Sequence, residues 1–114
     1  MHELSLCQAI VDTVRQHADE RPVRRVQVRI GHLRQVVPDS LLFSWEVMTA
    51  DTELAGSALE LEQVVAVVAC RRCGARTELD VPLMVCSRCE GHDVEVVQGE
   101  ELQIVAIDVV EEVR

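Results

Sequence analysis

The sequence predicts an α+β fold, in which two helices pack on a small sheet and a zinc-ribbon-like lobe with four cysteines is inserted. Three observations predict this fold. Apolar residues recur at three- and four-residue steps in two segments, which is typical of amphipathic helices. Other segments alternate apolar with polar residues, as half-buried strands do. Two Cys-x-x-Cys pairs separate the last strands from the others.

The first helical pattern covers residues 5–19. Its shared apolar face consists of Leu4, Cys7, Ile10, Val11, Val14 and Ala18. Ser5 and Gln8 resemble a capping box, and Pro22 follows the end of the helix. We expect this face to pack on the sheet.

A second helix is expected to begin at Pro38-Asp39-Ser40, with Asp39 or Ser40 as its N-cap. Its apolar stripe consists of Leu41, Leu42, Trp45 and Met48. The chain thus has two helices available to cover one sheet.

Residues 23–33 alternate and predict a half-buried strand. Val26, Val28 and Ile30 face one way, and Arg25, Gln27 and Arg29 face the other. Gly31 suits a bulge or turn at the end of this strand.

Residues 58–69 begin with alternation and become a continuous apolar run, which predicts one strand that grows more buried towards Cys70. Further short strands are expected at 77–81, 94–97 and 102–110. The sheet is therefore interrupted by the segment that contains the cysteines.

Cys70, Cys73, Cys86 and Cys89 form two pairs separated by twelve residues. Each Cys-x-x-Cys directs two thiolates at one ion, so this spacing predicts a structural zinc site with four thiolate ligands. A closed site of this kind leaves no position for a catalytic water. Two disulfides, or free thiols with a redox role, are the alternatives.

Composition excludes several functional classes. Only 2% of the 114 residues are aromatic and the net charge is −9, which argues against a surface that stacks bases or binds phosphates. We expect no membrane association, since no stretch approaches the roughly 20 apolar residues of a membrane span. The start of the chain has no signal-peptide pattern, and zinc-bound thiols indicate a reducing, cytoplasmic location. Cys7 lies in an apolar pattern and is expected to be a buried, inert thiol.

The N-terminus offers a second set of metal donors. The amine of Met1, the imidazole of His2 and the backbone amides are nitrogen ligands, and Glu3 follows them. Such nitrogen donors suit Ni(II) or Cu(II) in a planar or tetragonal field. The alternative is a terminal His-Glu that is merely solvated and frayed.

Over essentially its whole length the chain resembles the HypA/HybF family of hydrogenase nickel-incorporation proteins. The resemblance is carried by Met1-His2-Glu3-Leu4-Ser5, by Val37 to Phe43, by the paired cysteines, and by Gly99-Glu100-Glu101-Leu102 with Ile104. It implies a nickel metallochaperone that is not an enzyme. It also implies a nickel-binding α/β domain at 1–69 plus 94–114 and a zinc-binding lobe at 70–93.

The resemblance further implies that Met1, His2 and Glu3 bind Ni(II) transiently, while zinc remains structural. Asp39 or His92 would be an additional ligand; His17 and His32 are expected at the surface. The implied partners are a hydrogenase-maturation GTPase and the large subunit of NiFe hydrogenase, with urease as a further client in some organisms. Exposed edge strands would allow a homodimer.

Two other functions compete with this interpretation. A zinc-ribbon adaptor would have no nickel role and a basic face, which the net charge of −9 opposes. A dithiol oxidoreductase would need a reactive thiolate in an open site, whereas four cysteines around one ion leave none.

Overall fold

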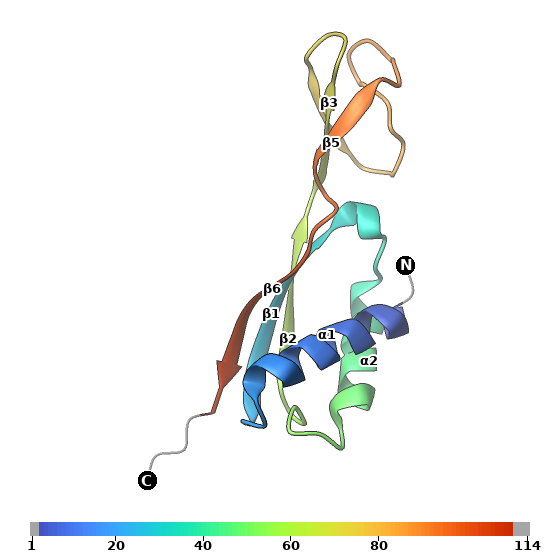
Figure 1. Ribbon diagram of the computed structural model, residues 1–114. Helices are drawn as coiled ribbons and strands as arrows, with labels where there is room; N and C mark the ends of the chain where they lie inside the picture. The colour runs from blue at the N-terminus through green and yellow to red at the C-terminus, as the bar shows by residue number, and fades with distance from the viewer. Residues whose placement is uncertain (1–2, 111–114) are drawn as a thin grey trace. The chain divides into compact units, whose positions relative to one another are not determined.

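The computed structural model describes residues 3–110 of the chain and divides into two compact units (Figure 1). The first, which we call the helical unit, comprises Val36–Glu62 with the residues up to Arg29 and from Gln103 onward. The second, the cysteine unit, comprises Ile30–Gln35 and Gln63–Leu102. None of the helices in the described part of the chain has the length and apolar character needed to cross a membrane.

Helix α1 spans Glu3–Ala18 and confirms most of the predicted apolar face. Its buried residues are Leu6, Cys7, Ile10, Val11, Val14 and Ala18. Leu4 was wrongly placed on this face: it is exposed, and Leu6 is buried instead. The capping box was also wrong, because the helix begins before Ser5, which therefore lies inside the first turn.

Helix α2 spans Pro38–Thr49, and its expected side-chain cap is absent. The N-cap residue is Val37, so Asp39 and Ser40 lie within the first turn instead of capping it. Pro38 explains the difference, because its fixed φ and missing N–H suit the first helical position without a cap. Leu41 and Trp45 are buried as predicted. The two helices pack against each other.

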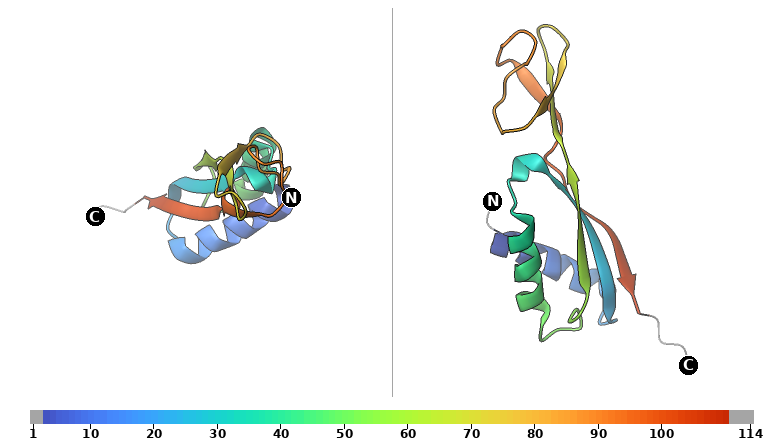
Figure 2. Two further views of the ribbon diagram at one scale, coloured as in Figure 1. Left: turned by 90° about the horizontal axis from the view of Figure 1, so that it is seen from above. Right: turned by 180° about the vertical axis from the view of Figure 1, so that it is seen from behind.

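The sheet of the helical unit has the strand order β2-β1-β6, with β1 at Val23–Gly31, β2 at Ala58–Val64 and β6 at Leu102–Val109. Val26, Val28 and Ile30 are buried, as predicted. Both helices lie to the same side of these strands in the right-hand view of Figure 2. The buried face of the sheet is therefore the one that the helices cover.

Ion pairs and a hydrogen bond on the other face of this sheet show the strand directions. Arg25 contacts Asp108 at 2.6 Å, while Arg29 donates to Gln103, so β1 and β6 are antiparallel. Arg29 also contacts Glu62, whereas Arg25 contacts Glu60 at 3.7 Å, so β1 and β2 run in parallel. These side chains are well exposed, and such pairs contribute only about 0–1 kcal/mol each.

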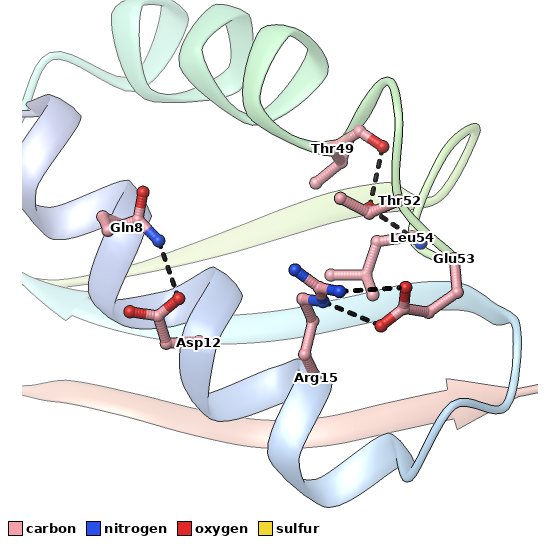
Figure 3. A network of polar contacts seen from close by, with 7 residues as sticks. All are labelled: Gln8, Asp12, Arg15, Thr49, Thr52, Glu53 and Leu54. Atoms are coloured by element: carbon pink, nitrogen blue, oxygen red, sulfur yellow. Dashed lines mark hydrogen bonds and ion pairs between the residues drawn. The ribbon is translucent and has the colours of Figure 1, made fainter.

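The loop after α2 is held by polar contacts with α1 and with itself (Figure 3). Arg15 of α1 donates to both carboxylate oxygens of Glu53, at 2.8 and 3.4 Å. Thr52 donates to the carbonyl of Thr49 and accepts from the N–H of Leu54. The fully buried side chain of Leu54 is thereby fixed in the core.

The cysteine unit contains a second sheet, in the order β4-β3-β5 with both pairs antiparallel. Its strands are β3 at Ala66–Cys70, β4 at Arg76–Leu79 and β5 at Val94–Gln98. A cluster of Ala66, Val68 and Leu79 forms its buried core, with Leu33, Val94 and Val96 packed against it. Leu33 belongs to a short 3-10 helix at His32–Arg34.

The expected single strand at 58–69 was wrong. The chain leaves the first sheet after Val64 and enters the second at Ala66, so β2 and β3 belong to different sheets. The side-chain amide of Gln98 donates to the carbonyl of Val65 at 3.0 Å, which satisfies the backbone at this break. The cysteine unit is also more extensive than the lobe proposed at 70–93, because β3 and β5 belong to it; a functional boundary at 70 and 93 stays a prediction.

Candidate metal centre

The four cysteines predicted as ligands come together in the cysteine unit. All four Sγ atoms lie within 4.8 Å of one another. Cys70 and Cys89 are 3.6 Å apart, and so are Cys73 and Cys86. A tetrahedron of thiolates around zinc has edges of about 3.8 Å, from a Zn–S bond of about 2.3 Å. The described cysteines form no disulfide, which needs sulfurs about 2.05 Å apart.

The first Cys-x-x-Cys turn is built by backbone hydrogen bonds around Cys70. The N–H of Cys73 donates to Cys70 Sγ at 3.4 Å, and the N–H of Gly74 donates to the Cys70 carbonyl at 2.9 Å. The N–H of Cys70 in turn donates to the carbonyl of Ala75. Gly74 has φ +77°, a conformation that glycine adopts without steric cost. The turn therefore aims both sulfurs at one point.

The second turn repeats this pattern residue by residue. The N–H of Cys89 donates to Cys86 Sγ at 3.5 Å, and the N–H of Glu90 donates to the Cys86 carbonyl at 2.9 Å. The N–H of Cys86 donates to the carbonyl of Gly91. Glu90 takes the place of Gly74 and also has a positive φ, +62°. The two turns thus contribute one pair of thiols each, held by equivalent backbone hydrogen bonds.

These hydrogen bonds make the thiols unequal acids. Donation by the N–H of Cys89 lowers the pKa of Cys86 to about 6. The N–H of Cys73 likewise lowers the pKa of Cys70. The N–H of Gly91 acts in the same direction on Cys89, but hydrogen bonds with Cys70 and Cys86 outweigh it and raise the pKa of Cys89 to about 11. The backbone thus favours the thiolate that a metal needs at the first cysteine of each pair.

Two contacts stabilise the cysteine turns and could not be predicted from the spacing of the cysteines. Arg71 anchors the first turn, since its side chain donates to Asp93 at 3.0 Å and its N–H donates to the Asp93 carbonyl. Thr77 of β4 holds the second turn by accepting the N–H of Ser87 at 3.0 Å. Ser87 lies inside the second cysteine pair, but Thr77 lies four residues after Cys73, and nothing in the sequence pattern connects the two.

We expect Glu90→Gly to strengthen the metal centre. A non-glycine residue at positive φ costs about 1–2 kcal/mol, so the substitution should raise zinc affinity by roughly fivefold or more in a chelator competition assay. Gly74→Ala, at the equivalent position with φ +77°, should lower the affinity by a similar factor. If both variants weaken zinc binding, the equivalence of the two turns does not hold.

The proposed nickel ligands are only partly covered by the structure. Met1 and His2 lie outside the described residues. Glu3 is the first residue of α1, where a carboxylate is favourable for the helix dipole. Asp39 is exposed in the first turn of α2. His92 is exposed in the cysteine unit, with Nδ1 3.3 Å from the carbonyl oxygen of Met84.

The remaining histidines and the fifth cysteine behave as predicted. His17 and His32 are exposed. Cys7 is fully buried in α1, and burial raises its pKa. A buried neutral thiol is a poor nucleophile and a poor metal ligand, so the cysteine chemistry of the described chain is confined to the four clustered thiols.

Comparisons with known proteins agree with this arrangement. The sequence profile of a family described as hydrogenase/urease nickel incorporation, metallochaperone, hypA, matches residues 1–109. The chain is 40% identical to the hydrogenase maturation factor HypA of Geotalea uraniireducens, over 96% of this chain and 99% of the relative. It is 34% identical to the factor of the same name from Trichodesmium erythraeum, over 97% of each.

The fold also matches a solved structure. The solution structure of the Ni metallochaperone HypA from Helicobacter pylori has a TM-score of 0.67, with 20% identity over 98% of this chain and all of that one. At this identity the likeness concerns the fold alone. The family match covers nearly the whole chain, so this protein belongs to the HypA family of hydrogenase/urease nickel-incorporation metallochaperones.

Proposed function

We propose that this protein carries Ni(II) to the large subunit of a NiFe hydrogenase during its maturation, and that its four-cysteine centre holds a structural zinc. Family membership over residues 1–109 carries the proposal, because the matched range includes the N-terminal donor set as well as the cysteines. The separation of two chemically different donor sets supports it.

Zinc fits the cysteine centre. Cys70, Cys73, Cys86 and Cys89 offer four soft sulfur donors, and their 3.6 Å contacts are close to the edge of a zinc–thiolate tetrahedron. A bound zinc would supply folding energy rather than catalysis, since four protein ligands complete its coordination. The N–H donors of Cys73 and Cys89 would stabilise the thiolates that it needs.

Nickel would use the other donor set. Met1 and His2 offer nitrogen ligands and Glu3 a carboxylate, which Ni(II) accepts in tetragonal geometry. Thiolates already satisfy zinc, so the two ions differ in their preferred ligands and do not compete for one site. A ligand set at the chain terminus also allows exchange without unfolding of the buried core.

Delivery requires partners. We propose a maturation GTPase as the source of energy and the hydrogenase large subunit as the recipient, with urease as a second client. The protein itself would act in the cytoplasm as a carrier and not as an enzyme. A homodimer stays an open prediction.

We expect His2→Ala to lose at least about tenfold in Ni(II) affinity, because one nitrogen donor of the site is removed. The measurement is calorimetric titration of Ni(II) into zinc-loaded protein. His17→Ala is the matched control, since His17 is exposed and its Nδ1 lies 2.8 Å from the Thr13 carbonyl.

The zinc content is measured in the same samples. Nickel binding lost only in His2→Ala, with one zinc per chain in every variant, would support two independent sites. Equal nickel binding in wild type and His2→Ala would remove the N-terminal site. The protein would then be better described as a zinc-ribbon adaptor with no nickel role.

A further inference from the structure

The only phenylalanine of the chain lies at the surface. Phe43 is 66% exposed in the middle of α2, while Trp45, two residues later, is 1% exposed in the core. Val47, one turn after Phe43, is 59% exposed. In a chain with so few aromatic residues, an aromatic side chain left in water on a rigid helix is unusual. Exposed aromatic residues of this kind are frequent anchors of protein interfaces.

Phe43 and Val47 belong to a stripe along α2 that contains no charged residue. The stripe consists of the exposed residues Ser40, Phe43 and Val47 of α2 and of exposed Ala50, which is the C-cap residue of the helix. Their spacing of three, four and three residues places them on one side of the helix, opposite the buried Leu41 and Trp45. This is the spacing of the a and d positions with which one helix packs against another.

The stripe has an acidic border. Asp39 and Glu46, seven residues apart and both exposed, follow one flank of the stripe at the g position of the same heptad pattern. Asp51 lies at the corresponding e position just beyond the helix. No Lys, Arg or His occurs anywhere in Pro38–Thr49. The charged groups that α2 itself offers to a helix packed on this stripe are therefore all carboxylates.

This border argues against a second copy of the same chain as the occupant. Two α2 helices packed antiparallel through their stripes would bring Asp39 of one copy towards Glu46 of the other. Like charges at flanking positions disfavour such pairing. The complementary partner is a helix whose apolar stripe is flanked by Lys or Arg.

We propose that the Ser40–Ala50 stripe of α2 is a docking surface for an amphipathic helix of a partner protein, with Phe43 and Val47 as its apolar anchors and basic flanks on the partner. The stripe belongs to the helical unit, and the four-cysteine centre belongs to the cysteine unit. The apolar anchors would supply the affinity. The carboxylates would select the partner and speed the encounter.

The test uses two synthetic helical peptides of three heptads, with leucine at a and d and either lysine or glutamate at e and g. Binding of each labelled peptide to the zinc-loaded full chain is followed by fluorescence anisotropy. We expect the lysine peptide to bind wild type about tenfold more tightly than the glutamate peptide. Phe43→Ser should weaken the lysine peptide by about tenfold or more. The double variant Asp39→Lys, Glu46→Lys should reverse the preference between the two peptides.

A matched pair of variants distinguishes specific binding at the α2 stripe from non-specific binding to exposed apolar residues. Val47→Ser and Val81→Ser remove valines of nearly equal exposure, 59% and 61%, from α2 and from the cysteine unit. Only Val47→Ser should weaken peptide binding. Equal affinities for the two peptides, or equal effects of the two valine variants, would overturn the proposal. So would a wild-type dimer that Phe43→Ser dissociates in analytical ultracentrifugation, because the occupant would then be a second copy.

The apolar anchors of this surface, Phe43 and Val47, are not among the proposed nickel ligands. The side chain of Phe43 points into solvent, so Phe43→Ser should keep the zinc content, the circular dichroism spectrum and the Ni(II) affinity of wild type. A Phe43→Ser protein that loses zinc or helicity has lost its fold. The effect of Val47→Ser on peptide binding then tests the proposal in its place. The nickel titration tests the proposed function and the peptide experiment tests the docking surface, so a negative result in one can be told apart from a negative result in the other.

Discussion

Cys86→Ala is expected to bind no zinc and to unfold the cysteine unit while the helical unit stays folded. Cys86 is fully buried and accepts the N–H of Cys89, so its loss removes a ligand and the hydrogen bond that shapes the second turn. The buried apolar cluster of this unit is only Ala66, Val68 and Leu79. Apparent zinc-binding free energies of about 10–16 kcal/mol exceed anything that so small a core provides.

The helical unit has its own core and should stay folded in Cys86→Ala. Leu6, Val14, Val26, Leu41 and Trp45 are buried in it, and none of them belongs to the cysteine unit. Limited proteolysis with mass spectrometry should therefore show new cleavage only within the cysteine unit, at residues 30–35 and 63–102. The helical signal in circular dichroism should persist.

Cys7→Ala is the control for this experiment, because it removes a buried thiol outside the centre. It should retain one zinc per chain. Zinc removal from wild type by a chelator should reproduce the cleavage pattern of Cys86→Ala, and added zinc should reverse it in wild type alone. Full zinc content and unchanged proteolysis in Cys86→Ala would contradict the role that we assign to the centre.

Gly31→Ala is expected to destabilise the zinc-loaded protein by roughly 2–6 kcal/mol. A Cβ at Gly31 would lie 1.9 Å from the carbonyl oxygen of Gly99 and 2.5 Å from the nitrogen of Glu100. These are backbone atoms, which cannot rotate away. The N–H of Gly31 donates to Glu101, and that of Leu33 to Gly99, both at 2.8 Å. Displacing the segment that contains Gly99 would break both hydrogen bonds.

Urea unfolding of the zinc-loaded protein measures this effect. Gly56→Ala is the matched control: Gly56 has φ +77° but nothing within 4 Å of an added Cβ. It should therefore cost only about 1–2 kcal/mol, from the backbone conformation alone. Equal losses in Gly31→Ala and Gly56→Ala would mean that the close approach at Gly31 is relieved without cost.

Gly31 also illustrates what the sequence did not reveal. The alternation of residues 23–33 predicted the strand and its buried face, but glycine at its end was interpreted as a turn or bulge. Gly31 has an extended backbone, φ −76° and ψ 146°. It must be glycine because another backbone segment, about seventy positions further along the chain, passes against it. No local pattern contains that information.

The helices also differ in which of their features the sequence predicted correctly. Apolar periodicity predicted that Ile10, Val14 and Trp45 would be buried, because residues on one side of a helix share their environment. It misplaced Leu4 by choosing it over Leu6, since a terminal turn is only partly covered by its neighbours. Residue type predicted a side-chain cap at Asp39 or Ser40, where Pro38 made a cap unnecessary.

By itself the sequence determined the α+β class, most of the buried face of α1, the buried face of β1 and the four-cysteine centre, because periodicity and ligand spacing are local properties of the chain. Only the tertiary structure decided that residues 58–69 divide between two sheets, that the two cysteine turns are held by Arg71 and Thr77, and that Phe43 stays in water. These outcomes depend on contacts between distant segments. Such contacts exist only once the chain has folded, so no reading of neighbouring residues supplies them.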